Sequence, residues 1–493
     1  MAEEWLTARV RRSPEALALV WEGRRWTYGE LGREVERYAA GLAALNGRAG
    51  QRVGVLLPNR PAYVCLVHAL ARLGAVLVPL NTRLTPPELR RQMAQVDCAL
   101  LIYGEETAAQ AEALAREGVA VHDAAALPQD KSGDVPVHPF SLGNVQAIVF
   151  TSGTTGRPKG AMLTFGNHFW SAMGSALRLG LQAEDRWLSC LPLYHVGGLA
   201  VLFRSCLYGT AVVLQDGFDV ARFRQSLDGD GVTMTSLVPT MLYRLLEAEM
   251  QWPDSLRLVL VGGAATSEAL AVTCAEEGIP IATTYGLTEA ASQVATMLPA
   301  EVARKPGCVG QPLMFTEVRI IDEAGATLPP GAPGEIAVRG PTVMQGYYGD
   351  AQATAEALVD GELRTGDIGT LDEDGDLWLL QRRSDMIVSG GENVYPAEVE
   401  HVLREHEAVA AACVVGLPHA EWGQQVAAMV VLEPGRELVE EDLLQFARER
   451  LAGYKLPWRV ALVEALPLTA SGKVARAEVV EELMANPRLA WDD

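Results

Sequence analysis

The sequence predicts an α/β protein that is built from more than one domain. Between about residues 27 and 290, continuous apolar runs such as RVGVLLPN (52–59) and LRLVLVGG (256–263) alternate with amphipathic stretches such as 62–73. Apolar runs of this length are typical of parallel strands buried on both faces, and the stretches between them are expected to be the helices that cover the sheet. The 493 residues exceed the length of a typical single domain.

The pattern changes near residue 308. Segments 317–340 and 376–383 predict short strands separated by Gly and Pro turns with no helix between them, which indicates an antiparallel or barrel-like part. Further along, helical patterns at 396–409 and 440–453 flank two apolar strands, so a smaller α+β domain is expected. The predicted domains are 1–383, with the barrel-like part at about 308–383, and 384–493, with the boundary at 383–385.

Composition excludes several classes of protein. Lys and Arg number 41 against 62 Asp and Glu, which gives a formal net charge of −21, and no basic block offsets it. Binding to nucleic acid or to an anionic membrane is therefore not expected. No segment approaches the ~20 apolar residues of a membrane span, and the N-terminus lacks the apolar core of a signal peptide. Seven scattered cysteines without a CxxC pair fit a reducing cytoplasm. The sequence does not decide between a monomer and a homo-oligomer.

The segment TSGTTGRPKG (151–160) follows a short apolar strand at 144–150 and is too polar to anchor a core. Glycine lets the backbone approach an anion, hydroxyl and N–H groups donate hydrogen bonds to its oxygens, and a lysine neutralises charge. Segments of this composition are more often ordinary surface loops. The P-loop pattern, GxxxxGK followed by Ser or Thr, is absent, because Lys159 is followed by Gly160. The segment is therefore either an ordinary surface loop or a polyphosphate site, and a P-loop NTPase is disfavoured.

Four further motifs follow in order: YGLTE (285–289), LRTGD (363–367), RRSDMIVSGGENVYPAEVE (382–400) and PLTASGKVAR (467–476). Each alone has an ordinary explanation as a turn, a solvated acid or an exposed lysine. Together with the glycine-rich segment, and in this order, they resemble the adenylate-forming superfamily of acyl-CoA synthetases, peptide-synthetase adenylation domains and firefly luciferase. The resemblance covers essentially the whole chain.

This resemblance implies a fold and an activity. The fold is a large N-terminal domain of two α/β sheets and a small β-barrel, followed by a smaller, mobile α+β domain. The family uses ATP and Mg²⁺ to convert a carboxylate into an acyl-adenylate with release of pyrophosphate, and a thiol then displaces AMP. Its C-terminal domain rotates between the two half-reactions about one hinge residue. That position is Ser384 here, where many relatives carry Asp or Lys.

The resemblance also implies roles for individual residues. Lys473 would stabilise the charge that develops as the adenylate forms, because a fixed ammonium there acts more strongly on the transition state than on the ground state. Thr288 would bond the α-phosphate, and Glu289 would hold Mg²⁺, a cation that prefers oxygen ligands. Phosphates, adenine and ribose would be bound by Thr151, Ser152, Gly153, Thr154, Thr155, Gly156, Lys159, Gly262, Gly263, Ala264, Thr284, Tyr285, Gly286, Thr288, Asp367 and Arg382.

Coenzyme A is the expected thiol, since no carrier domain follows, and Gly390 and Gly391 would let its pantetheine pass close to the backbone. Segment 166–209 and the SGGENVYPAEVE motif are most similar to the o-succinylbenzoate–CoA ligase group of menaquinone biosynthesis. His195 would line the junction of the acid and thiol tunnels and act in catalysis. Arg204, on an apolar helix, would bind a second carboxylate of the acid through paired, charge-assisted hydrogen bonds.

Three alternatives stay open at this point. Arg204 could reach solvent or pair with an internal acid, in which case it says nothing about the substrate. The enzyme could be a generalist ligase for medium-chain or aromatic acids. It could also be a non-catalytic nucleotide-binding homologue, although the residues of the chemistry are all present: Lys159, Glu289, Asp367, Arg382 and Lys473.

Overall fold

A computed structural model describes residues 3–45, 47–127, 138–152, 158–381, 386–419, 421–467 and 474–485. The chain divides into two compact units. The first comprises 1–82, 93–150 and 160–382, and the second comprises 83–92, 151–159 and 383–493. The predicted domain boundary at 383–385 lies outside the described residues.

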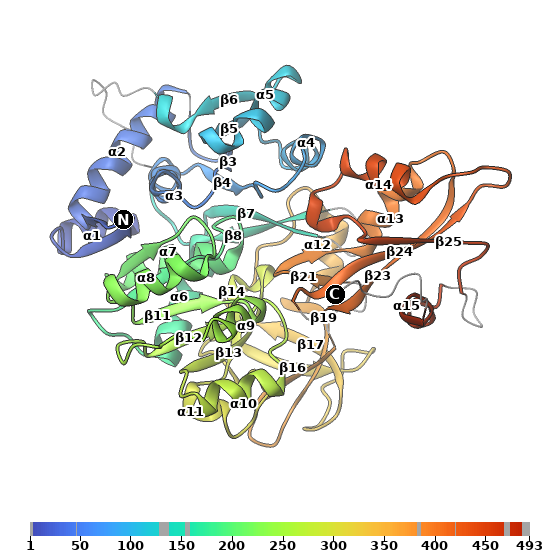
Figure 1. Ribbon diagram of the computed structural model, residues 1–493. Coiled ribbons are helices and arrows are strands. Elements are labelled where there is room, and N and C mark those ends of the chain that lie inside the picture. Colours follow the sequence, from blue (N-terminus) through green and yellow to red (C-terminus); the bar gives the residue numbers. More distant parts are fainter. Residues whose placement is uncertain are drawn as a thin grey trace. The chain divides into compact units, whose positions relative to one another are not determined.

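Two sheets with mainly parallel pairing form the core of the first unit (Figure 1). The nine-stranded sheet has the order β15-β14-β13-β12-β11-β9-β10-β1-β2, and the six-stranded sheet has the order β6-β5-β3-β4-β7-β8. Parallel pairing from β13 through β12, β11, β9 and β10 to β1, and among β3 to β7, confirms the predicted α/β class. The strands are β1 (Leu17–Trp21), β2 (Arg24–Thr27), β3 (Arg52–Leu56), β4 (Val76–Pro79), β5 (Leu100–Tyr103), β6 (Ala120–Asp123), β7 (Val145–Ser152), β8 (Pro158–Thr164), β9 (Arg186–Ser189), β10 (Ala211–Leu214), β11 (Met234–Leu237), β12 (Leu258–Val261), β13 (Ile281–Leu287), β14 (Ser292–Thr296) and β15 (Gln311–Pro312).

The helices of this unit begin and end at residues that suit those positions. Helix α3 has Pro61 in its first turn and stops at Gly74, whose φ of 67° only glycine adopts without strain. Helix α2 starts with a capping box between Thr27 and Glu30. The helices are α1 (Trp5–Arg12), α2 (Tyr28–Ala44), α3 (Pro61–Leu73), α5 (Ala108–Arg116), α6 (Phe165–Leu179), α7 (Val196–Tyr208), α8 (Val220–Gly229), α9 (Pro239–Glu247), α10 (Glu268–Glu276), α11 (Pro299–Val302) and α12 (Ala351–Ala357).

The segment after β15 forms a five-stranded antiparallel sheet, as the Gly- and Pro-rich pattern predicts. Its order is β16-β17-β19-β18, and β20 pairs with residues 368–371 of β19, beyond the residues 362–363 that pair with β18. The strands are β16 (Glu317–Ile321), β17 (Gly334–Arg339), β18 (Leu358–Val359), β19 (Glu362–Leu371) and β20 (Leu377–Gln381).

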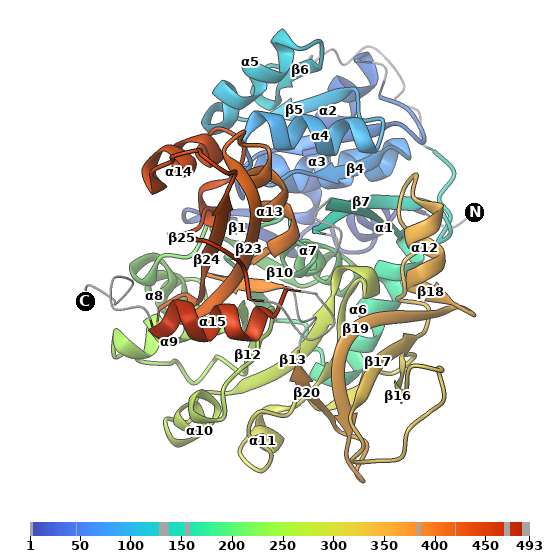
Figure 2. The ribbon, with the colours of Figure 1, turned by 90° about the vertical axis from the view of Figure 1, so that its right-hand side faces the viewer.

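The second unit has its own sheet and its own core. Helices α13 and α14 bury apolar side chains such as Val399 and Leu443 against one face of the sheet, and α15 buries Val479 against the other (Figure 2). Helix α4 (Pro86–Gln95) contributes its first residues to this unit. The remaining elements are β21 (Ile387–Ser389), β22 (Glu392–Val394), β23 (Val409–His419), β24 (Gly423–Leu432), β25 (Arg459–Val463), α13 (Pro396–Arg404), α14 (Glu440–Arg448) and α15 (Arg476–Ala485).

No helix in the described part of the chain combines the length and the apolar character that crossing a membrane requires.

Candidate active site

The carboxyl ends of β12 and β13 bring several predicted nucleotide residues together. The two strands are parallel, with Val261 opposite Thr283, and Gly262 and Gly263 follow the end of β12 directly. A Cβ on Gly262 would lie 2.7 Å from Cγ2 of Thr284, and Gly263 has a φ of 80°. Glycine is therefore required at both positions, the first by close packing and the second by its backbone. Ligands of open parallel sheets bind at this edge.

A strained turn follows β13. The chain passes through a short 3₁₀ helix, Thr288–Ala290, and returns as β14 in antiparallel pairing with β13. A Cβ on Gly286 would lie 1.9 Å from the carbonyl oxygen of Ser292. Ala291 and Ser292 have φ values of 53° and 103°, which side chains larger than glycine rarely adopt. Strain of this kind is concentrated at functional sites.

Glu289 lies in this turn and is held by Tyr347. The carboxylate is buried, and its Oε1 accepts a hydrogen bond of 2.8 Å from the hydroxyl of Tyr347. The backbone N–H of Met344 donates to the Glu289 carbonyl oxygen over 2.8 Å. Mg²⁺ is usually held by one or two protein carboxylates together with substrate phosphates, so a single oriented carboxylate fits this ion. Tyr347 was not predicted from the sequence, because nothing in QGYYGD marks its partner.

Tyr285 and Asp367 also meet in the first unit, although 81 residues separate them in the chain. The Tyr285 hydroxyl donates to Oδ2 of Asp367 over 2.7 Å, and both side chains are buried. The backbone N–H of Asp367 donates to Oγ1 of Thr365 over 3.1 Å. A residue predicted for the adenine and a residue predicted for the ribose are thus linked, and the Tyr285 hydroxyl orients the Asp367 carboxylate.

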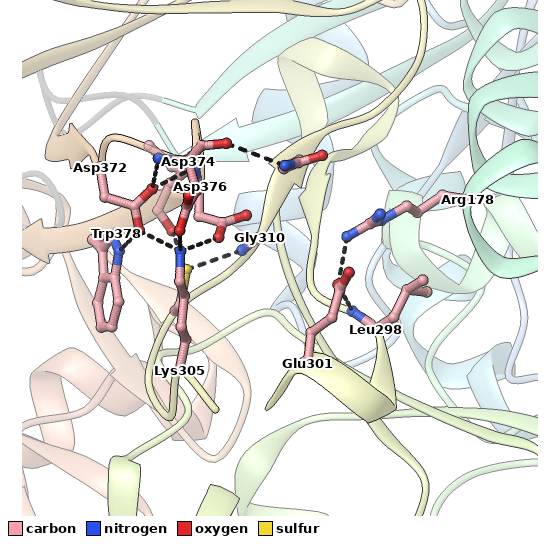
Figure 3. A network of polar contacts seen from close by, with 12 residues as sticks. Arg178, Leu298, Glu301, Lys305, Gly310, Asp372, Asp374, Asp376 and Trp378 are labelled. Carbon is pink, nitrogen blue, oxygen red and sulfur yellow. Dashed lines mark hydrogen bonds and ion pairs between the residues drawn. The ribbon is translucent and has the colours of Figure 1, made fainter. Parts of the chain in front are cut away.

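A second acidic group lies in the β19–β20 turn and is occupied by a lysine (Figure 3). Among the described residues, only Asp372, Asp374 and Asp376 form a group of three side chains of the kinds that bind metal ions. The Nζ of Lys305 lies 2.8, 2.8 and 2.5 Å from their carboxylate oxygens. Burial alone would raise the pKa of Asp372, but hydrogen bonds from Lys305 and Trp378 lower it to about 2. The group is a partly exposed ion-pair network within the chain, and Glu289 remains the candidate for Mg²⁺.

His195 precedes helix α7 at the end of a loop that Asn59 fixes. The buried amide of Asn59 donates to the Leu191 carbonyl oxygen over 2.9 Å and accepts from the Leu193 N–H over 2.9 Å. A Cβ on Gly198 would lie 2.4 Å from the carbonyl oxygen of Pro192, so the turn into the helix requires glycine. Asn59 was missed from the sequence, where it only ends the apolar run 52–59.

Arg204 lies in the middle of α7 and is 2% exposed. Its Nη2 lies 3.4 Å from Oγ of Ser292, and its guanidinium carbon lies 5.7 Å from the ring centroid of Trp187. Its Nε has no hydrogen-bond partner, and no described carboxylate pairs with it or acts on its charge. Burial lowers the pKa of the guanidinium. Within the described structure, both ordinary explanations of Arg204 are wrong, since it neither reaches solvent nor pairs with an internal acid.

In the second unit, Gly390 and Gly391 form the two-residue turn between β21 and β22, with φ values of 57° and 85°. Two consecutive positive φ values are typical of a type I′ hairpin turn, which by itself favours glycine, asparagine or aspartate at these positions. A Cβ on Gly390 would also lie 2.7 Å from the ring of Trp422. Thr151 lies in β7 and Lys159 in β8. Outside the described residues lie the side chain of Ser152 and the residues Gly153, Thr154, Thr155, Gly156, Arg382, Ser384 and Lys473.

The parallel sheets, with Gly262, Thr284 and Glu289 at one edge, define a nucleotide-binding α/β enzyme with a separate α+β unit. The chain belongs to the AMP-binding enzyme family: that family matches residues 6–348, and the AMP-binding enzyme C-terminal domain matches residues 398–473. The resemblance inferred from the ordered motifs is confirmed.

The similarity to named relatives extends over nearly the whole chain. The 2-succinylbenzoate--CoA ligase of Bacillus mycoides is 41% identical over 485 residues, which are 97% of this chain and 99% of that protein. A double mutant of o-succinylbenzoate CoA synthetase (MenE) from Bacillus subtilis, bound with its product analogue OSB-NCoA, is 38% identical, has a TM-score of 0.93 and covers 97% of this chain and 98% of its own. The same enzyme in complex with ATP and magnesium ion is 38% identical, with a TM-score of 0.75 and coverage of 96% and 98%.

Proposed function

We propose that this chain is an ATP-dependent acid–CoA ligase that acts on o-succinylbenzoate. A carboxylate of the acid attacks the α-phosphorus of ATP, so that the acyl-adenylate forms and pyrophosphate leaves. The thiol of coenzyme A then attacks the acyl carbon, so that the thioester forms and AMP leaves. The names of relatives 38 to 41% identical support this reaction.

The choice of acid depends on Arg204. A fatty acid places only a hydrocarbon chain in the protein, and a buried guanidinium would destabilise that site. o-Succinylbenzoate carries two carboxylates, one of which is activated while the other must enter the protein or remain in water. Burial of an unpaired carboxylate would be very unfavourable, so a fixed cation is needed where it enters. Arg204 is a buried cation without a described carboxylate partner, and it is what such a substrate requires.

The remaining residues have complementary roles in this proposal. Glu289 holds Mg²⁺, which neutralises phosphate charge when bound, and Tyr347 orients Glu289. Asp367 accepts hydrogen bonds from the ribose together with Arg382, while Gly262, Gly263, Ala264 and Tyr285 surround the adenine. Lys473 acts on the developing charge of the first half-reaction, His195 lines the path of the thiol, Gly390 and Gly391 border pantetheine, and Ser384 is the hinge. The phosphates of ATP are bound by Thr151, Ser152, Gly153, Thr154, Thr155, Gly156, Lys159 and Thr288, and Thr284 and Gly286 complete the nucleotide site.

The compartment that we propose is the cytoplasm. All seven cysteines are unpaired and buried, which suits a reducing environment. Burial raises the pKa of several of these thiols, to about 12 for Cys190, so they are poor nucleophiles.

A pyrophosphate-release assay with the full chain, ATP, Mg²⁺ and a panel of acids tests the proposal. The panel contains o-succinylbenzoate, two analogues that each lack one carboxylate (3-benzoylpropionate and 2-butyrylbenzoate), and decanoate. We expect kcat/KM for o-succinylbenzoate to exceed that for every other acid by about 100-fold or more, since an unpaired buried arginine rejects a substrate without its partner. Equal use of decanoate would instead identify a generalist ligase. Absence of pyrophosphate with all four acids would favour a non-catalytic homologue.

A further inference from the structure

Polar side chains lie between helices α6 and α7, in a region where most neighbours are apolar. We call this group the polar seam and define it as His168 and Ser171 of α6, Arg204 of α7 and Ser292 of β14. His168 and Ser171 are three residues apart and therefore lie on the same face of α6, and both are buried. Buried polar atoms destabilise a protein unless they find partners, so each one here requires an explanation.

Two nitrogen atoms of the polar seam have no partner. Ser171 is satisfied, because its hydroxyl donates to the Ala291 carbonyl oxygen over 2.7 Å. Within the described part of the chain, Nε2 of His168 and Nε of Arg204 have no hydrogen-bond partner. Such atoms destabilise the folded chain unless a group from outside it binds them. Ser175 of α6 and Ser205 of α7 also carry buried hydroxyl oxygens without a described partner, but only His168 and Arg204 combine a nitrogen donor with a positive charge, which an anion requires.

The two orphans belong to residues that flank the same strained turn. Both α6 and α7 pack against β14, whose first residue is Ser292. From α6, one turn beyond His168, Ser171 contacts Ala291, and from α7 Arg204 reaches Ser292. The ring of His168 lies 4.5 Å from that of Phe203, the chain neighbour of Arg204. This turn directly follows Thr288–Ala290, which contains the candidate metal ligand.

The charges of the polar seam suit one carboxylate. Burial and the charge of Arg204 lower the pKa of His168 to about 3, so the imidazole is neutral at physiological pH. A neutral imidazole donates one hydrogen bond without adding a second positive charge. The seam therefore presents a single fixed charge, from Arg204, and one neutral donor beside it.

We propose that His168 and Arg204 together form the subsite for the carboxylate that is not activated, with Arg204 as its counter-ion and His168 as its neutral hydrogen-bond donor. This inference rests on the proposed function, since it assumes a dicarboxylic aromatic acid. It assigns His168 a role in substrate specificity: the residue contacts the substrate at a point remote from the reacting carboxyl group. Because both side chains extend from helices, the subsite is rigid before the acid binds.

Substitution of His168 in the full-length enzyme tests this role. His168→Leu should lower kcat/KM for o-succinylbenzoate about 10- to 100-fold, mainly through KM, because one hydrogen bond to a charged group is lost. His168→Gln retains an N–H donor and should keep most of the activity. KM for ATP should not change in either variant. His68→Gln is the control, because His68 is an equally buried histidine on α3 outside the site, and glutamine can still donate to Glu4, whose Oε1 lies 3.9 Å from Nδ1 of His68. Full activity of His168→Leu with o-succinylbenzoate would overturn the inference.

A measurement on the wild-type enzyme covers the case in which His168→Leu does not fold. Histidine labelled with ¹³C at Cε1 is followed by NMR, and the His168 signal is assigned with His168→Gln. o-Succinylbenzoate should shift this signal, whereas 3-benzoylpropionate, which lacks the carboxylate on the ring, should not. If the enzyme turns over o-succinylbenzoate and the His168 signal does not move, the substrate does not contact His168 and the inference is wrong. If the wild-type enzyme does not use o-succinylbenzoate at all, the proposed function fails and this inference fails with it.

Discussion

At the scale of single residues, Arg204 shows how a buried charge can report on an absent partner. Its helix is apolar on nearly all sides, and ten of the thirteen residues of α7 are buried. A guanidinium in this position destabilises the empty protein, because desolvation is not offset by an ion pair. An anionic substrate that binds there removes this cost, so binding affinity and specificity come from the same group.

Arg204→Ala tests this coupling. We expect kcat/KM for o-succinylbenzoate to fall by about two to three orders of magnitude, because the second carboxylate loses its counter-ion. Because Arg204→Ala also leaves a cavity, Arg204→Met is the variant for the stability comparison: it keeps most of the buried volume, and its empty form should melt close to or above wild type, since an unpaired buried charge is removed. Arg178→Ala is the matched control, because Arg178 also contacts β14, through the Thr296 carbonyl oxygen, but pairs with Glu301 over 2.8 Å. A parallel loss of activity with every acid in the panel would assign Arg204 a purely structural role.

The link between Tyr347 and Glu289 gives a second test at this scale. Tyr347→Phe removes the hydroxyl that orients the carboxylate, so a higher Mg²⁺ concentration should be needed for half-maximal activity, and Glu289→Gln should raise it further. The neighbouring Tyr348→Phe is the matched control, because that hydroxyl bonds Asp97 at an exposed position. Magnesium titrations of the three variants make the comparison. Identical curves for Tyr347→Phe and Tyr348→Phe would show that Tyr347 does not assist metal binding.

The sequence alone could locate residues whose role depends on local motifs and could not locate those that act through distant contacts. Tyr285 and Glu289 lie in a recognisable motif, and Arg204 is unusual within its own helix. Asn59 and His168 have no local signal of this kind. Asn59 acts on a loop 132 residues away, and His168 becomes informative only when its Nε2 is seen to lack a partner.

At the scale of elements, the sequence predicted the buried strands better than their ends. The apolar run at 52–59 becomes a strand only to Leu56, because Pro58 cannot donate to a strand ladder and Asn59 bonds the loop before His195. The hairpin of β1 and β2 was not predicted at all. It completes the nine-stranded sheet by pairing Leu19 with Val212, and such a distant partner leaves no pattern in the local sequence.

Gly286 fixes the turn between β13 and β14, and Gly286→Ala tests that requirement. The added methyl group would overlap the Ser292 carbonyl, so we expect a loss of at least about 2 kcal/mol in the free energy of unfolding. Gly217→Ala is the control, because a Cβ there meets no atom within 4 Å and should change stability by less than about 0.5 kcal/mol. Urea unfolding of both variants measures the difference. Equal midpoints would mean that the turn adjusts without cost.

Lys305 ties the segment before β15 to the β19–β20 turn, and this tie depends on pH. The pKa of Asp372 is about 2 in the folded protein, below the ~3.9 of an unfolded chain. Its stabilising contribution is therefore present above about pH 4 and is lost as the pH falls towards 2. Lys305→Met should lower the melting temperature at pH 7, because the three carboxylates then repel one another. The difference in melting temperature between wild type and Lys305→Met should narrow as the pH falls from about 4 to about 2.

Asp374→Asn in the Lys305→Met background serves as the control, because it removes one of the repelling charges. Partial recovery of the melting temperature is expected, and high salt should have the same effect by screening. A melting temperature that is unchanged in Lys305→Met would show that the network contributes no stability.

At the scale of the whole molecule, each compact unit has its own apolar core, as expected for domains that can move as separate bodies. Pattern and composition were sufficient to predict the α/β class and the smaller α+β part, because buried strands and amphipathic helices leave local periodicity. The assignment of chemistry to each half-reaction needs more than periodicity. It depends on which charged groups act while the bond to phosphorus forms.

Lys473→Ala separates the two half-reactions. Negative charge shifts between the carboxylate and the phosphoryl oxygens only while the adenylate forms, so removal of a fixed ammonium should slow that step by about two to three orders of magnitude. Attack of coenzyme A on a supplied acyl-adenylate does not involve transfer to phosphorus from ATP and should proceed at nearly the wild-type rate. The measurements are pyrophosphate release with ATP and o-succinylbenzoate, and thioester formation from synthetic o-succinylbenzoyl-adenylate and coenzyme A. If both rates fell equally, Lys473 would act on the folding of the second unit and not on the chemistry of adenylation.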